Sequence, residues 1–320
     1  MIRNAVLKTV LAYYTVAVVI LLSGYFAPAR TEFVTYVPIL LSVLLLVPLY
    51  MWQRNYRLRT GLLREISEKD KRSVIFCSLA LFILALSVRI PSVLMMGIPY
   101  EKTPLIYLIV LTMLIIGKTD LSAFGFRTEK LGKSLLYGFA FFAVLGGLMS
   151  LVSYVLIYGF VNQVAVESYD VVSSMLSMPF MILCVGLSEE GLFRGYIQAR
   201  LQKVCSLRTA ILFQAFLFGL WHFVWNLSPF DPFVMTQYVL STFLMGLLFG
   251  YFFAKTGSLV SLVFAHGLWD SVLPWIIEKK VTMDYFSTFS TSSQLLVAIL
   301  PLMVAAIVTV LFVKYFINRV

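Results

Sequence analysis

The hydrophobic positions of the chain are gathered into long apolar runs that are separated by short polar stretches. A run of about 20 apolar residues is long enough to cross a bilayer as a helix. We predict ten spans, at residues 5–27, 33–52, 74–98, 104–117, 134–160, 171–192, 207–227, 234–254, 257–276 and 293–315. The fourth run is short and the ninth also fits a re-entrant segment, so we expect an all-α, polytopic membrane bundle of about eight to ten transmembrane helices.

The charged residues between these runs predict an orientation. Segment 53–73 is rich in Lys and Arg, as is 118–133, whereas 161–170 contains neither residue. Cytoplasmic loops of membrane proteins carry the excess of Lys and Arg, which places both basic segments inside. Only Lys279 and Lys280 depart from this pattern. We therefore predict an integral protein of the cell inner or plasma membrane, with cytoplasmic N- and C-termini.

The composition agrees with a membrane protein and excludes several other classes. Of the 320 residues, 61% are hydrophobic and 12% are charged, against about 45–50% and about 25% in soluble domains. The net charge of +10 is explained by basic cytoplasmic loops, so no nucleic-acid partner is expected. Three cysteines without a CxxC pair indicate neither a disulfide framework nor a zinc ribbon.

Two adjacent carboxylates, Glu189 and Glu190, stand out near the end of the sixth apolar run. A central acidic residue costs roughly 2.5–3.5 kcal/mol on insertion scales, so a chain that carries two of them is expected to use them. The two histidines of the chain, His222 and His266, also lie in apolar runs. Polar groups in hydrocarbon should face the bundle interior and contact one another.

Helical spacing separates the two glutamates. Arg194 lies four residues beyond Glu190, which predicts an intrahelical ion pair and leaves Glu189 for His222 or a water molecule. Glu189 and His222 lie at similar distances from the charged turn between their helices, so an antiparallel hairpin would place them at equal depth. His266 and Asp270 are four apart and share a helix face.

A metal site is the less favoured alternative for these residues. Glu, His and Asp side chains are suitable ligands for zinc or manganese. The sequence contains no HExxH motif, however, and no other local pair of ligands. We therefore expect no cofactor.

Three motifs lie in order on successive apolar runs: Glu189-Glu190-x-x-x-Arg194, Phe218-x-x-x-His222 and His266-x-x-x-Asp270. Together they resemble the signature motifs of the CPBP family, which comprises type II CAAX prenyl endopeptidases and "Abi" membrane proteins of the bacteriocin-processing or immunity type. The resemblance covers roughly residues 118–276. It implies a core at 118–276, preceded by N-terminal spans at 1–117 and followed by a loop and helix at 277–320.

The resemblance also implies a function. The chain would be an intramembrane endopeptidase that cleaves a membrane-associated peptide, lipidated or CAAX-like substrates included. Glu189 with His222 would activate the attacking water, and His266 with Asp270 would stabilise the oxyanion. Glu190 with Arg194 would support the site. The bilayer and the peptide substrate are the expected partners. The sequence does not indicate whether the protein is a monomer or an oligomer.

Two other functions fit the sequence. A membrane scaffold or immunity protein would retain the motifs for structure or partner binding. A transporter is the third class, since Arg89 and Pro91 within the third span could mark a broken helix.

Overall fold

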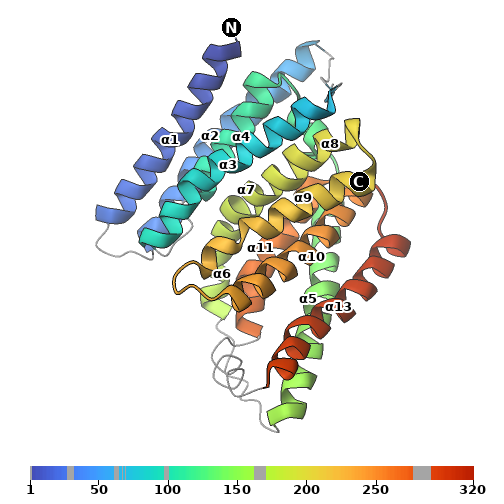
Figure 1. Cartoon of the computed structure of the whole chain (residues 1–320). Coiled ribbons are helices and arrows are strands. Elements are labelled where there is room, and N and C mark those ends of the chain that lie inside the picture. Colours follow the sequence, from blue (N-terminus) through green and yellow to red (C-terminus); the bar gives the residue numbers. More distant parts are fainter. Residues whose placement is uncertain are drawn as a thin grey trace.

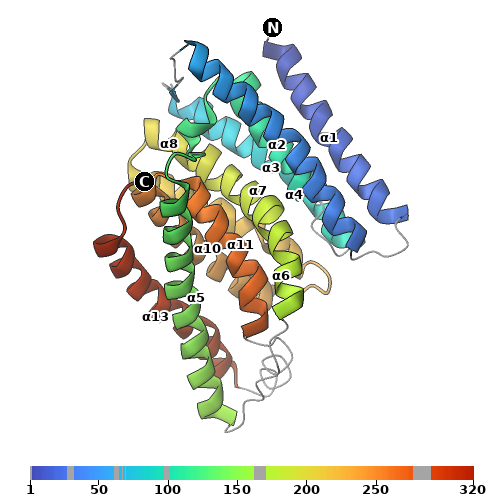
Figure 2. The same ribbon diagram turned by 180° about the vertical axis from the view of Figure 1, so that it is seen from behind.

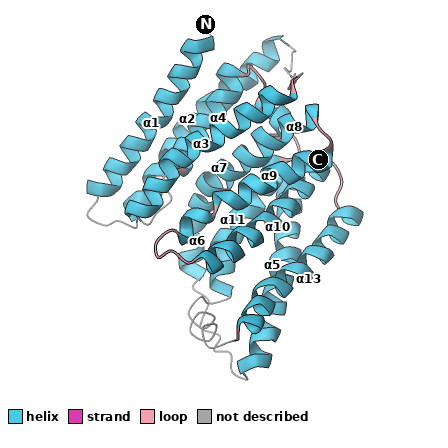
Figure 3. Ribbon diagram, viewed as in Figure 1, coloured by secondary structure: helices cyan, strands magenta, loops and turns pink. Residues whose placement is uncertain are grey.

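The computed structural model describes residues 2–26, 32–60, 65–66, 68, 70–96, 101–161, 171–276 and 290–320. Every regular element in this part of the chain is helical (Figures 1 and 3). The elements are α1 (Ile2–Phe26), α2 (Glu32–Thr60), α3 (Lys71–Met96), α4 (Lys102–Leu111), η1 (Thr112–Ile116), η2 (Leu121–Phe124), α5 (Leu131–Val161), α6 (Val171–Phe180), η3 (Met181–Gly186), α7 (Leu187–Glu190), η4 (Gly191–Gln198), α8 (Ala199–Val204), α9 (Leu207–Trp221), η5 (Phe223–Asn226), α10 (Pro232–Thr256), α11 (Leu259–Ile276) and α13 (Thr291–Phe316).

The described helices confirm the prediction of a polytopic membrane bundle. Eight of them are long and apolar enough to cross a bilayer, and two shorter apolar helices cover Lys102–Ile116 and Leu259–Val272. These two coincide with the fourth and ninth predicted spans. Residues 162–170 and 277–289, which include Lys279 and Lys280, lie outside the described part of the chain.

The expectation of a broken third span is wrong. Helix α3 continues from Lys71 to Met96 and contains Pro91 without ending there. Arg89, on the preceding turn, is buried. The sequence feature that suggested a transporter therefore belongs to an ordinary continuous helix, and Arg89 requires another explanation.

The helices form a central group with a flank on each side (Figures 1 and 2). The continuous run from α6 to α8 occupies the centre together with α9, α10 and α11. Helix α9 packs along α10, and α11 packs against η3 and α5. Helix α13 covers α5 on one flank, while α1 to α4 form the other, where α4 contacts α7 and α3 contacts η5. Helices α3 and α4 therefore reach the central group directly.

The central run that carries the two glutamates is not a uniform α-helix. Segments η3 and η4 are π-helical, and the single α-helical turn α7 lies between them. Pro179 lies just before η3 and cannot donate a backbone hydrogen bond. Wide π-helical turns are rare and often occur at functional sites. Here they flank the turn that presents Glu189 and Glu190.

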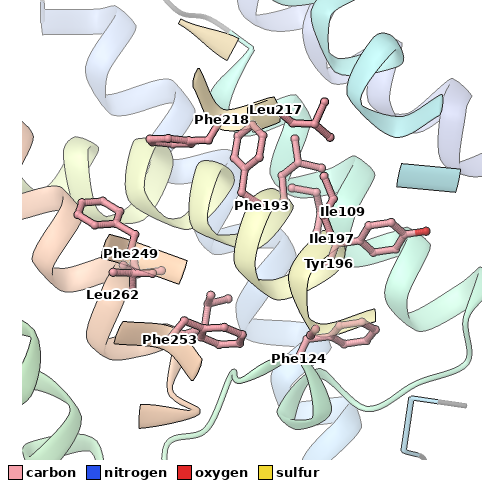
Figure 4. Packing of buried hydrophobic residues seen from close by; sticks show 14 of the residues in the cluster. Ile109, Phe124, Phe193, Tyr196, Ile197, Leu217, Phe218, Phe249, Phe253 and Leu262 are labelled. Atoms are coloured by element: carbon pink, nitrogen blue, oxygen red, sulfur yellow. The ribbon is translucent and has the colours of Figure 1, made fainter. Parts of the chain in front are cut away.

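Aromatic side chains fill the space beside this turn (Figure 4). The ring of Phe193, on η4, lies 5.1 Å from the ring of Phe218 and 5.9 Å from that of Trp221, both in edge-to-face contact. Phe249, on α10, lies 6.3 Å from Phe218. Such pairs are favourable beyond their buried area and restrict side-chain movement. The packing thus fixes α9 and α10 against the motif helix, the continuous run from α6 to α8 that carries Glu189 and Glu190.

Two glycines allow α11 to approach η3 closely. A Cβ atom on Gly267 would lie 2.7 Å from Ile182 Cα, and one on Gly186 would lie 2.7 Å from the Val263 carbonyl oxygen. Small residues at helix interfaces in membranes permit this backbone contact. The contact brings α11, which carries His266, beside the glutamates.

We predict that Gly267→Ala destabilises the protein, because the added methyl group must displace the backbone of Ile182. Overpacking of this kind typically costs about 1–3 kcal/mol. Thermal denaturation of the purified protein in detergent should show a lower midpoint. The matched control is Gly147→Ala in α5, where the new Cβ would meet nothing within 4 Å. An equal effect of both substitutions would contradict the close-contact explanation.

Candidate functional site

Glu189 is buried at the centre of the bundle, with 2% of its surface exposed. Its Oε1 accepts a hydrogen bond from Trp221 Nε1 at 2.8 Å and another from Lys102 Nζ. The Arg89 guanidinium lies 3.9 Å from the same oxygen. All three groups come from other helices, so the position of this carboxylate is fixed from several sides.

The second oxygen of Glu189 faces the two histidines. Its Oε2 lies 3.9 Å from His222 Nε2 and 3.8 Å from His266 Nε2. No described residue donates a hydrogen bond to this buried atom. The sequence thus correctly predicted that Glu189 and His222 lie together, but their separation exceeds a direct hydrogen bond. Polar atoms at such a distance are commonly bridged by water.

Glu190 points to a different set of partners. Arg194 Nη1 donates to Glu190 Oε1 at 3.0 Å, which confirms the predicted ion pair within the helix. His266 Nδ1 lies 2.6 Å from the same oxygen. The Arg194 guanidinium also lies 4.2 Å above the ring of Phe218 and donates to the Gly246 carbonyl at 3.3 Å. Glu190 and Arg194 therefore connect their own helix to α9, α10 and α11.

The backbone at the end of α9 sets the orientation of His222. There the chain tightens, and the His222 N–H bonds the Gly219 carbonyl instead of the Phe218 carbonyl. The Phe218 carbonyl lies 2.7 Å from His222 Nδ1. Because a carbonyl only accepts, Nδ1 is the donor. In the neutral ring, Nε2 is then an acceptor, and it faces Glu189.

His266 lies between two carboxylates. Its Nδ1 contacts Glu190, and its Nε2 lies 3.4 Å from Asp270 Oδ2, one turn further along α11. Carboxylates accept hydrogen bonds, so this setting favours a ring with a proton on each nitrogen. His266 is therefore a donor, in contrast to His222. Within the described residues, no group of three or more His, Cys, Asp or Glu has the arrangement of a metal site.

The structure adds four residues that the sequence did not place at this site, namely Arg89, Glu101, Lys102 and Trp221. The prediction that the Glu190–Arg194 pair leaves Glu189 for His222 or water holds for Oε2, which faces His222, but not for Oε1, which Lys102 occupies. The signal was present in the sequence, since Arg89, Glu101 and Lys102 are ionisable residues within or beside apolar runs.

The fold and site define a polytopic helical membrane protein with a buried cluster of Glu, His, Arg and Lys side chains at its centre. Residues 171–272 match the family model described as "Type II CAAX prenyl endopeptidase Rce1-like". The match contains all three motifs and agrees with the resemblance that they indicated. The matched family is one of proteases, which supports peptidase activity at the level of the family. Neither the curated proteins nor the solved structures contain a match to the chain.

The burial of Arg194 and Glu190 generates a prediction. Removal of one member of a buried ion pair costs roughly 3–5 kcal/mol, because the remaining charge has no partner. Arg194→Ala should therefore lower the yield of folded protein and its thermal midpoint in detergent. The exposed Arg208→Ala is the control and should change little. The double variant Glu190→Gln with Arg194→Gln should be less damaged than Arg194→Ala, and an equally severe loss would contradict an origin in the unpaired charge.

Proposed function

We propose that the protein is an intramembrane endopeptidase that cleaves a peptide bond with a water molecule activated by Glu189 and His222. The observation that carries this proposal is the pair of acceptors, Glu189 Oε2 and His222 Nε2, separated by 3.9 Å inside the bundle. The family match over residues 171–272 supports the reaction class.

A water molecule between these two acceptors would direct its protons to them and its lone pairs outward. Glu189 Oε2 takes one proton as the water oxygen bonds to the carbonyl carbon of the peptide, which forms a tetrahedral intermediate. The same proton then passes to the peptide nitrogen as the C–N bond breaks. The products are an amine and a carboxylic acid, which keeps the second proton of the water, and Glu189 returns to its initial state.

The negative charge on the intermediate requires a hydrogen-bond donor. His266 meets this need because Glu190 and Asp270 favour a ring with a proton on each nitrogen: Nδ1 stays on Glu190 at 2.6 Å, and Nε2–H, 3.4 Å from Asp270, is shared with the intermediate. An ionised Asp270 is then compatible with the reaction, since it holds the donor instead of acting as one. Glu190 and Arg194 support the site by fixing His266 and the motif helix.

The substrate would approach from the side of the site that carries Asp270. The Asp270 side chain is 29% exposed, against 3% for Glu189, and Tyr238 and Trp225 on the neighbouring segments are also exposed. An approach to Asp270 among apolar helices would suit a membrane-associated peptide, including a lipidated or CAAX-like one. We propose the bilayer and such a peptide as partners, with no nucleic acid and no metal cofactor in the reaction.

We predict that Glu189→Gln and His222→Ala each reduce cleavage by about 10²–10⁴-fold, the usual contribution of a positioned acid or base. The purified protein is offered farnesylated and unmodified forms of the same C-terminal peptides, and products are identified by mass spectrometry. The exposed Glu129→Gln should retain activity.

Unchanged cleavage by both site variants would contradict the mechanism. A chelating agent should leave cleavage intact, whereas a loss that zinc reverses would show a metal-dependent reaction. The Lys102–Glu189 ion pair also suits a second function, that of a scaffold or immunity protein which keeps the cluster for structure. That function predicts no cleavage by the wild type, together with a cellular phenotype that Glu189→Gln preserves.

We propose that both termini lie in the cytoplasm, as the basic loops predict. Cysteine substitutions at Lys130, beside a basic loop, and at Ser228, between η5 and α10, give matched sites because both residues are exposed. In intact cells, a membrane-impermeant thiol reagent should label the cysteine at 228 and spare the one at 130. The reverse pattern would place the termini on the outer side.

A further inference from the structure

Three charged residues from α3 and α4 are buried beside Glu189, although they lie outside the segment matched by the family model. Arg89 is 1% exposed, Glu101 0% and Lys102 3%. Burial of charges is expensive even when they are paired, and replacement of a buried pair by apolar groups is often neutral or stabilising. Stability alone is therefore a poor explanation for this group.

The contacts of the group converge on one oxygen of Glu189. Lys102 Nζ pairs with Glu189 Oε1 and lies 3.2 Å from Glu101 Oε1, which in turn pairs with Arg89. Arg89 also holds Trp221: its Nε donates to the Trp221 carbonyl at 3.0 Å, and its guanidinium lies 4.2 Å from the indole ring. The Trp221 indole N–H then donates to the same Glu189 oxygen.

This arrangement divides the Glu189 carboxylate into two unlike oxygens. Oε1 is occupied by Lys102 and Trp221, so the carboxylate plane is set and Oε2 is turned toward His222 and His266. If Lys102 instead bridged both oxygens, it would compete with water for the base. Its contact with Oε1 leaves Oε2 available for the proton transfer.

We propose that Lys102 is a positioning residue for the hydrolysis, acting together with Trp221 to hold Glu189 through Oε1, with Arg89 and Glu101 fixing both donors. Helices α3 and α4 therefore contribute residues to the proposed active site. This inference rests on the proposed function, because it assigns Lys102 a part in the same reaction.

The test measures kcat and KM separately for a peptide that the wild type cleaves. Lys102→Met removes the charge while keeping a side chain of similar length, and we expect kcat to fall by about 10–100-fold, since loss of catalytic geometry can cost that much. KM should change little, because Lys102 lies behind Glu189 and not on the exposed side of the site. The exposed Lys130→Met is the matched control and should retain both constants.

A second variant keeps the test decisive if Lys102→Met does not fold. Trp221→Phe removes the indole donor and keeps a smaller aromatic ring beneath Arg89, and it should also lower kcat with little change in KM. Unchanged or increased kcat in a folded Lys102→Met, or unchanged kcat in Trp221→Phe, would overturn the proposal. Absence of cleavage by the wild type would instead overturn the proposed function on which it rests.

Discussion

The requirement that every buried charge has a partner governs the centre of this molecule. Three cations, Arg89, Lys102 and Arg194, are nearly inaccessible, and so are the three carboxylates Glu101, Glu189 and Glu190. In hydrocarbon each of them needs an opposite charge or several hydrogen bonds. The cluster meets this requirement only when helices from both halves of the chain are packed together. The pairing of charges at the site therefore depends on the assembly of the whole bundle.

Local backbone features serve this arrangement. The π-helical segments η3 and η4 flank the turn of Glu189 and Glu190, and the glycine contact between η3 and α11 lets His266 reach Glu190. At the end of α9, a change of helical pitch frees a carbonyl that fixes the His222 ring. Each feature departs from a regular α-helix, and each one orients a polar side chain toward the same point.

Hydropathy was sufficient to predict the bundle, because the cost of exposing backbone groups to lipid leaves helices as the practical solution. It also located the two short helices correctly as the doubtful spans. Spacing within one helix predicted the Glu190–Arg194 pair. The equal distances of Glu189 and His222 from the turn between their helices predicted that these two residues lie close together. The contacts of Arg89 with Trp221 and of Lys102 with Glu189 were out of reach, since they join residues 132 and 87 positions apart on helices whose relative rotation no periodicity encodes.

The three motifs make this kind of sequence recognisable, but they do not include every residue of the site. Lys102, which pairs with Glu189, lies outside them. A chain that shares the three motifs but places other residues at the start of its fourth helix would surround the same glutamate and histidines with a different set of charges. Two such proteins could have matching signatures and still differ in turnover. Under the proposed function, the N-terminal helices are thus a place where natural variation can tune the rate without altering a motif residue.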